Sequence, residues 1–179
     1  GFCYWIAGMS AFDAICHAFS TVAIGGFSTH DASLGYFNSP AILLIASVFM
    51  VLAAINFAIH FVVWRAKNPL KYFEDSEARF YLTSLLLSCL VCSAFLIHEK
   101  VYSFSDGLLM GVFHTISIAT TTGFAATNFS AWPSFLPIFL ILLSFMGGCA
   151  GSTGGGIKVV RIMLMAKQGV RELSQLVHP

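Results

Sequence analysis

Two segments that carry a glycine at the same place in a repeated pattern could bind a cation through their backbone. Residues 17–27 (HAFSTVAIGGF) align without a gap with residues 114–124 (HTISIATTTGF), so that Gly26 matches Gly123. A cation without its water shell needs several oxygen ligands, and backbone carbonyls provide them without a fixed charge that would trap the ion. Directing successive carbonyls toward one axis requires strained or left-handed backbone, which glycine tolerates. A plain glycine turn would explain one copy equally well, but two copies in register favour a pair of pore loops.

The carbonyl groups of two filter segments, 22–27 and 119–124, are the predicted cation ligands. The threonine hydroxyls of the later segment could add further oxygen ligands. Ser20 and Ser117 precede the two segments and are placed to support the loops from behind. The predicted ion-binding residues are Val22, Ala23, Ile24, Gly25, Gly26, Ala119, Thr120, Thr121, Thr122 and Gly123.

The composition of the chain is that of an integral membrane protein. Of the 179 residues, 58% are hydrophobic and 9% are charged, whereas soluble domains contain roughly 25% charged residues. No Asp, Glu, Lys or Arg occurs between Asp31 and Arg65 or between Asp106 and Lys158, and both stretches exceed the roughly 20 residues that span a bilayer. A soluble protein would need a charged surface that nine basic and eight acidic residues cannot supply. The lipid bilayer is therefore a predicted partner.

The elements that position the filter segments follow from the lengths of the apolar stretches. Residues 107–119 are apolar but too few to cross a membrane, and they end in threonine and glycine rather than in charges. This pattern indicates a re-entrant helix that enters the membrane and returns. Residues 12–22 are its counterpart in the earlier copy. The chain is thus predicted to be an all-α membrane protein built from helix–pore-loop–helix repeats.

The predicted boundaries place one repeat on either side of a charged loop. The chain begins in what looks like the tail of a helix, so we expect it to be an internal piece of a longer protein. The predicted parts are a repeat over 1–67 (pore helix 12–22, filter 22–27, long helix 40–64), a cytoplasmic loop over 68–79, a repeat over 80–168 (helix 80–97, pore helix 107–119, filter 119–124, broken helix 134–167) and a cytoplasmic connector over 169–179.

A glycine-rich segment interrupts the last apolar stretch. As one straight helix, residues 134–167 would measure about 51 Å at ~1.5 Å per residue, well beyond a bilayer core of about 30 Å. Glycines oppose helix continuity, so the helix is predicted to break there. Polar backbone inside a membrane is tolerated only where protein shields it or where it faces water. The segment consists of Gly147, Gly148, Cys149, Ala150, Gly151, Ser152, Thr153, Gly154, Gly155 and Gly156.

The basic residues predict which side of the membrane each loop faces. Four of them lie within 65–79 and four follow the last apolar stretch, whereas Lys100 alone lies between the other elements. Short cytoplasmic loops carry an excess of Lys and Arg. The charged loops are therefore predicted to be cytoplasmic, and the two filter loops are predicted to open toward the outside.

Three segments together resemble the Trk/Ktr/HKT superfamily of potassium transporters. They are 20–31 (STVAIGGFSTHD), 119–124 (ATTTGF) and 147–158 (GGCAGSTGGGIK). The resemblance implies a potassium-channel-like fold of four helix–pore-loop–helix repeats around one ion path, two of which this chain would hold: the second, with its start missing, and the third. It also implies that Gly26 and Gly123 are filter glycines and that the glycine-rich segment is an intramembrane gating loop. The second-repeat filter departs from the simpler Thr-Thr-Thr-Gly form.

Taken together, the residues and the resemblance predict potassium uptake across the cytoplasmic (inner) membrane of a bacterium by a multi-pass protein. Potassium is the predicted substrate; no other cofactor, no transition-metal site and no nucleic-acid partner is predicted. The resemblance further implies a homodimer and a cytosolic nucleotide-binding regulatory ring that contacts residues 71–79. Two alternatives stay open: a sodium or mixed-cation transporter of the same architecture, and an intramembrane enzyme or non-transporting membrane scaffold. The sequence leaves open whether transport is channel-like or coupled to protons or sodium.

Several polar residues have a structural explanation as well as a functional one. His17 and His114 share a repeat position, and hydrogen bonding behind the filter is favoured over a metal site because no Cys or carboxylate cluster accompanies them. Asp13 could attract cations or cap a helix. Asn56 and His60 could face the pore or bond a neighbouring helix.

Motifs for catalysis or nucleotide binding are not satisfied. Cys89 and Cys92 have the spacing of a redox pair, but they lie in an apolar run where free buried cysteines are favoured. Residues 151–158 differ from a phosphate-binding loop because Ile157 separates the last glycine from the lysine and no Ser or Thr follows. The sequence also has no carboxylate pair and no nucleophile–base spacing, so no enzymatic activity is predicted.

Overall fold

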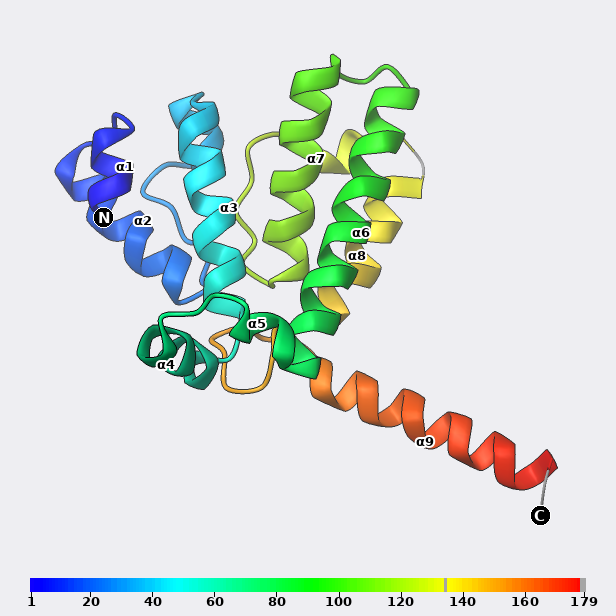
Figure 1. Cartoon of the computed structure of the whole chain (residues 1–179). Helices are drawn as coiled ribbons and strands as arrows, with labels where there is room; N and C mark the ends of the chain where they lie inside the picture. Colours follow the sequence, from blue (N-terminus) through cyan, green and yellow to red (C-terminus); the bar gives the residue numbers. More distant parts are fainter. Residues whose placement is uncertain (134, 178–179) are drawn as a thin grey trace.

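The chain folds into helices joined by irregular loops (Figure 1). The computed structural model describes residues 1–133 and 135–177. Its regular structure is helical apart from one isolated parallel bridge between Met146 and Ile157, which confirms the predicted all-α class. The elements are α1 (Phe2–Ile6), α2 (Ala11–Val22), the 3₁₀ helix η1 (Ser33–Phe37), α3 (Pro40–Ala54), α4 (Phe57–Ala66), α5 (Lys71–Glu74), α6 (Ser76–His98), α7 (Phe104–Ala119), the 3₁₀ helix η2 (Phe129–Ala131), α8 (Phe135–Phe145) and α9 (Val159–Val177).

The two short helices that precede the filter segments, α2 and α7, begin with the same cap. The Ser10 hydroxyl accepts the N–H of Asp13 at 3.1 Å, and the Ser103 hydroxyl accepts the N–H of Asp106 at 3.3 Å. A serine at the N-cap satisfies an amide that has no partner inside the helix. An acidic residue in the first turn is also favoured by the helix dipole. The cap of α2 is therefore Ser10, and Asp13 is an acidic residue of the first turn beside it.

Helix α7 lies at the centre of the helical packing. It packs along α6 and also contacts α3 and α8. Figure 1 shows α1, α2 and α3 on one side of α7, and α6 and α8 on the other. Phe113 on α7 and Met50 on α3 are fully buried, as is Tyr81 on α6. The two copies of the repeat are thus held together by apolar contact between α3 and α7.

The prediction of one long helix over 40–64 is wrong. Helices α3 and α4 replace it and are bent by 99° across Ile55 and Asn56. The bend is stabilised from both sides: the Asn56 side chain caps α4 by accepting the N–H of Ala58 at 2.8 Å, and the Ala54 carbonyl accepts the N–H of Cys149 at 2.8 Å. Backbone groups that a continuous helix would pair internally are instead paired with distant parts of the chain.

His60 bonds neighbouring segments, which is one of the two alternatives stated for it, whereas the Asn56 side chain caps its own helix α4. The Nε2 atom of His60 lies 2.8 Å from the Leu52 carbonyl and its Nδ1 atom lies 2.7 Å from the Tyr72 hydroxyl. His60 therefore joins the end of α3 to α5 across the bend. The predicted loop over 68–79 contains α5 and the first residues of α6, so it is more ordered than the charge pattern indicated.

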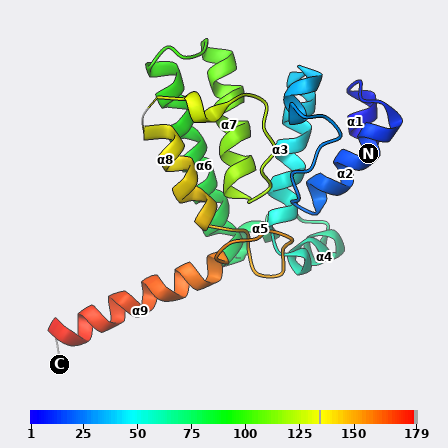
Figure 2. The same cartoon turned by 180° about the vertical axis from the view of Figure 1, so that it is seen from behind.

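The last apolar stretch is divided by an irregular segment between α8 and α9. Residue 134, the predicted start of the broken helix, lies outside the described residues, and α8 begins at Phe135. Helix α9 passes the predicted end at 167 and continues to Val177, so the predicted connector over 169–179 is helical as far as it is described. Residues 178 and 179 of that connector lie outside the described residues. Figures 1 and 2 both show α9 projecting away from the other helices.

Only some of the helices have the length expected of a membrane span. Among the described residues, α6 is long and apolar enough to cross a bilayer by itself, and α3 and α4 meet the same criterion only when they are counted as one bent pair. Helices α7 and α8 are apolar but shorter. The two filter segments follow α2 and α7.

Candidate functional site

Both predicted filter segments have the same unusual backbone. The dihedral φ is +53° at Ile24 and +69° at Gly26, and it is +65° at Thr121 and +88° at Gly123. These are equivalent positions of the repeat, and the residue between each pair is not in the left-handed region. The two loops therefore share one backbone conformation, and matched carbonyl-bearing loops are what a carbonyl-lined cation path requires.

The amide groups of both loops are tied to the helix that precedes them. The N–H of Gly25 donates to the Ser20 carbonyl at 2.8 Å, and the N–H of Thr122 donates to the Ser117 carbonyl at 2.9 Å. The preceding amides in each loop bond to the last turn of the helix in the same register. Because the N–H groups point back toward the helix, they satisfy its terminal carbonyls and leave the carbonyls of the loop for other partners.

The two loops approach each other closely at Gly26. A Cβ atom at Gly26 would overlap the carbonyl oxygen of Thr122 and would lie 2.9 Å from the carbonyl carbon. A Cβ at Gly123 would meet no atom within 4 Å. Glycine is therefore required at Gly26 by both space and conformation, whereas at Gly123 the left-handed φ alone requires it.

Two buried histidines connect the helices to the segments that follow the filters. The Nδ1 atoms of His17 and His114 lie 2.8 Å and 2.9 Å from carbonyls one turn earlier in their helices. Since a carbonyl only accepts, Nδ1 carries the proton, and Nε2 is the acceptor in both rings. Nε2 of His17 accepts from the Ser28 hydroxyl at 2.8 Å, and Nε2 of His114 accepts the N–H of Ala126 at 3.3 Å. Both rings position the loop that follows their helix, which is the role favoured from the sequence. Among the described residues, no group of three His, Cys, Asp or Glu side chains could hold a metal ion.

Two threonine hydroxyls of the third-repeat filter bond each other. The Oγ1 atoms of Thr120 and Thr122 lie 2.7 Å apart, and both side chains are buried. The Ser117 hydroxyl donates to the Phe124 carbonyl at 2.7 Å and holds the return of the loop. The Ser117 hydroxyl therefore supports the backbone of the loop, while the hydroxyls of Thr120 and Thr122 are bonded to each other.

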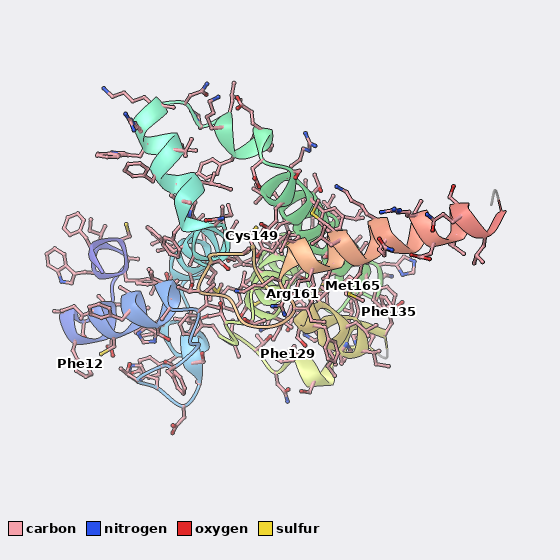
Figure 3. All side chains as sticks on the ribbon, turned by 90° about the horizontal axis from the view of Figure 1, so that it is seen from below. Phe12, Phe129, Phe135, Cys149, Arg161 and Met165 are labelled. Carbon is pink, nitrogen blue, oxygen red and sulfur yellow. The ribbon has the colours of Figure 1, made fainter. Side chains whose placement is uncertain are left out.

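The glycine-rich segment 147–156 lies against the ends of α3 and of the two filter loops. Gly147, Gly148 and Cys149 are buried, and Figure 3 shows Cys149 toward the middle of the molecule while Phe12 lies at its edge. The Thr153 hydroxyl donates to the Val22 carbonyl at 2.9 Å, and the N–H of Gly155 donates to the Thr121 hydroxyl at 2.8 Å. The structure therefore brings the predicted filter and the predicted gating loop into direct contact.

Glu77 and Lys158 hold this segment in place, and neither role was predicted from the sequence. One carboxylate oxygen of Glu77 accepts the N–H of Ala150 at 2.8 Å and the N–H of Val160 at 3.0 Å. The Lys158 ammonium donates to the carbonyls of Gly154 and Ser152. A lysine engaged with carbonyls of its own loop is consistent with the rejection of a phosphate-binding motif. The role of Glu77 was not predicted because Glu77 is one of several charged residues in a predicted connecting loop.

Polar side chains also gather around Asp13, at the N-terminal end of α2 and outside the spanning helices. The Thr29 hydroxyl donates to its carboxylate at 2.6 Å and the Ser10 hydroxyl at 2.7 Å, while Nε2 of His30 lies 3.4 Å away. The hydrogen bond from Thr29, followed by that from Ser10, holds the pKa of Asp13 below its usual range. This carboxylate therefore stays charged beside Thr29 and His30, which follow the predicted filter segment 22–27.

The repeated fold and the paired loops define a helical membrane protein of the pore-loop class. The chain belongs to the TrkH family of cation transport proteins, whose profile matches residues 3–179. It is 52% identical over 98% of its length to the Trk system potassium uptake protein TrkH of Halomonas elongata and 47% identical to TrkH of Escherichia coli K12. The crystal structure of the potassium transporter TrkH from Vibrio parahaemolyticus superposes with a TM-score of 0.95 at 51% identity, covering 99% of this chain and 39% of that one. The chain spans 36% of the length of both curated relatives.

Proposed function

We propose that this chain supplies two pore-loop repeats of a protein that takes up potassium across the bacterial cytoplasmic membrane. The observation that carries the proposal is the shared left-handed backbone at Ile24 and Gly26 and at Thr121 and Gly123. Two loops with one conformation are what a path with carbonyl ligands on several sides requires. The names of the relatives, which are potassium uptake proteins, support potassium as the ion.

In this mechanism the carbonyls of residues 22–26 and 119–123 replace the water shell of the ion. Neither segment contains a charged side chain, so the ion is bound by dipoles that release it as readily as they accept it. Direct hydrogen bonds from the loop amides to the preceding helices keep the carbonyls from turning away. Selectivity then depends on the shape of the backbone rather than on a particular side chain.

The glycine-rich segment 147–156 is the proposed gate. Its contacts with Val22 and Thr121 put it next to both filter loops. Its backbone is bonded to the end of α3 and to Glu77 rather than within a helix. A cytosolic nucleotide-binding ring, acting on a homodimer, would move it from the cytoplasmic side. The charged stretch 71–79 and α9 are the surfaces that we assign to that partner, since α9 continues directly from the gate.

The proposal is tested with the full-length parent protein, purified and reconstituted in liposomes with a potassium gradient. Uptake of radioactive rubidium is expected above that of empty liposomes, and external potassium should compete with it more strongly than external sodium. Equal competition by sodium and potassium would favour the mixed-cation alternative. Uptake no greater than in empty liposomes would overturn the transport proposal.

A further inference from the structure

The glycine-rich segment reaches each filter loop through a different kind of contact. In the third repeat, the hydroxyl of Thr121 accepts the N–H of Gly155 at 2.8 Å. In the second repeat, the hydroxyl of Thr153 donates to the carbonyl of Val22 at 2.9 Å and lies 3.3 Å from that of Ala53. Because a hydroxyl has one proton, the shorter contact with Val22 is the main one.

The two contacts compensate for a difference between the repeats. Thr121 occupies the position of Ile24, and both are β-branched residues in the left-handed region, where such side chains are strained. Threonine at 121 offers an oxygen to the loop, whereas isoleucine at 24 cannot. On that side the loop brings its own hydroxyl, Thr153, and uses a backbone carbonyl as the acceptor.

The part of the segment that makes these contacts is held together as one unit. The ammonium of Lys158 bonds to the carbonyls of Ser152 and Gly154, the residues on either side of Thr153. Gly154 is buried, while Thr153 and Gly155 are exposed on the face turned to the filters. Displacing the segment therefore breaks both contacts together.

We propose that Thr121 and Thr153 form a two-point latch that holds the glycine-rich segment against the inner ends of the two filter loops. The latch rests on the gating role proposed above for residues 147–156. With the latch closed, the segment obstructs the path and occupies the Val22 carbonyl, one of the predicted ion ligands. Thr121 and Thr153 are positioning residues: they set how often the segment is docked and leave the identity of the conducted ion unchanged.

The test uses isosteric variants of the full-length parent protein, reconstituted without its cytosolic partner. Thr121→Val and Thr153→Val remove one hydroxyl each, and each should raise rubidium flux about fivefold, the effect of losing one ordinary hydrogen bond. Thr121→Ser and Thr153→Ser keep the hydroxyl and should restore flux close to the wild-type value. The matched control is Thr83→Val, which removes an exposed hydroxyl bonded to the Arg79 carbonyl of its own helix α6 and not to the segment. Relative sodium and potassium flux should stay at the wild-type ratio in Thr153→Val.

The outcomes separate the latch from the gate. If both Val variants conduct like Thr83→Val while a protein with a shortened 147–156 segment conducts more than wild type, the segment is a gate and the latch is wrong. If the shortened protein is well folded and has wild-type flux, the gating proposal fails and the latch fails with it. Thr153 is exposed, so Thr153→Val keeps the test decisive even where Thr121→Val does not fold. The latch would also be overturned if the serine variants raised rubidium flux as much as the valine variants do.

Discussion

The second-repeat and third-repeat filter loops have the same backbone but differ in what supports them. In the third repeat, Ser117 bonds the Phe124 carbonyl, and the Phe124 side chain is fully buried. In the second repeat, the equivalent Ser20 hydroxyl has no hydrogen-bond partner among the described residues, and Phe27 is 82% exposed. The shared helix-to-loop hydrogen bonds thus determine the path of the backbone, while side-chain support is local in the third repeat and sparse in the second.

The difference indicates that a filter conformation can be specified by very few interactions. Both loops need the left-handed residues and the amide bonds to the preceding helix. The second loop adds close contact with its neighbour, since Gly26 packs against the peptide of Thr122. The conformation of the second-repeat loop therefore depends on its contact with the third-repeat loop. Substitutions at equivalent positions of the two loops should have unequal effects.

The largest expected inequality is between the two filter glycines. Gly26→Ala adds a methyl group that overlaps Thr122 and forces a strained φ, which should cost about 3 kcal/mol. Gly123→Ala meets open space and should cost only the strain, about 1 kcal/mol. Thermal unfolding of the full-length protein in detergent measures the difference, and both variants should raise sodium flux relative to potassium flux.

The matched control for this pair is Gly169→Ala, because Gly169 lies on α9 with open space around its Cα and an ordinary φ. It should leave ion preference unchanged and should not destabilise the protein, because alanine is favoured over glycine inside a helix. Equal destabilisation by Gly26→Ala and Gly123→Ala would show that the contact between the loops does not matter. Wild-type ion preference in both variants, at normal expression, would remove the filter assignment.

A smaller inequality is expected between the two buried histidines. Nε2 of His114 lies 3.3 Å and 3.4 Å from the backbone N–H groups of Ala126 and Thr127, which have no freedom to turn elsewhere. His114→Phe should therefore cost about 2 kcal/mol through unpaired amides. Nε2 of His17 serves a serine hydroxyl that can rotate to another acceptor, so His17→Phe should cost about 1 kcal/mol.

His98 provides the control for the histidine pair, since its side chain is 83% exposed at the end of α6. His98→Phe should shift the unfolding temperature little, because it removes no buried hydrogen bond. If His17→Phe lowers the free energy of unfolding as much as His114→Phe, the two histidines stabilise their loops equally and the predicted difference is wrong. Loss of metal-dependent stabilisation in either variant would contradict the hydrogen-bonding role of these residues.

The sequence predicts the features that are repeated in it and misses those that depend on a distant partner. Local patterns of glycine, charge and apolar length predict the filter segments, the two short helices and the break after α8. They do not predict the bend at Ile55 and Asn56, because the surrounding residues are uniformly apolar and its cause is the bond between Ala54 and Cys149. The same holds for Thr121, whose partner is a glycine amide that leaves no side-chain pattern to detect.

The smallest expected inequality lies between the serines behind the filters and tests the comparison most directly. Ser117→Ala removes the hydrogen bond to the Phe124 carbonyl and should destabilise the protein by about 1 kcal/mol. Ser20→Ala removes a buried hydroxyl that has no partner in the described part of the chain, so it should be neutral or slightly stabilising. The free energies of unfolding of the two variants, each measured beside wild type, test this difference. A cost at Ser20 equal to that at Ser117 would mean that Ser20 finds an acceptor in the full-length protein, and the second loop would then be supported in the same way as the third.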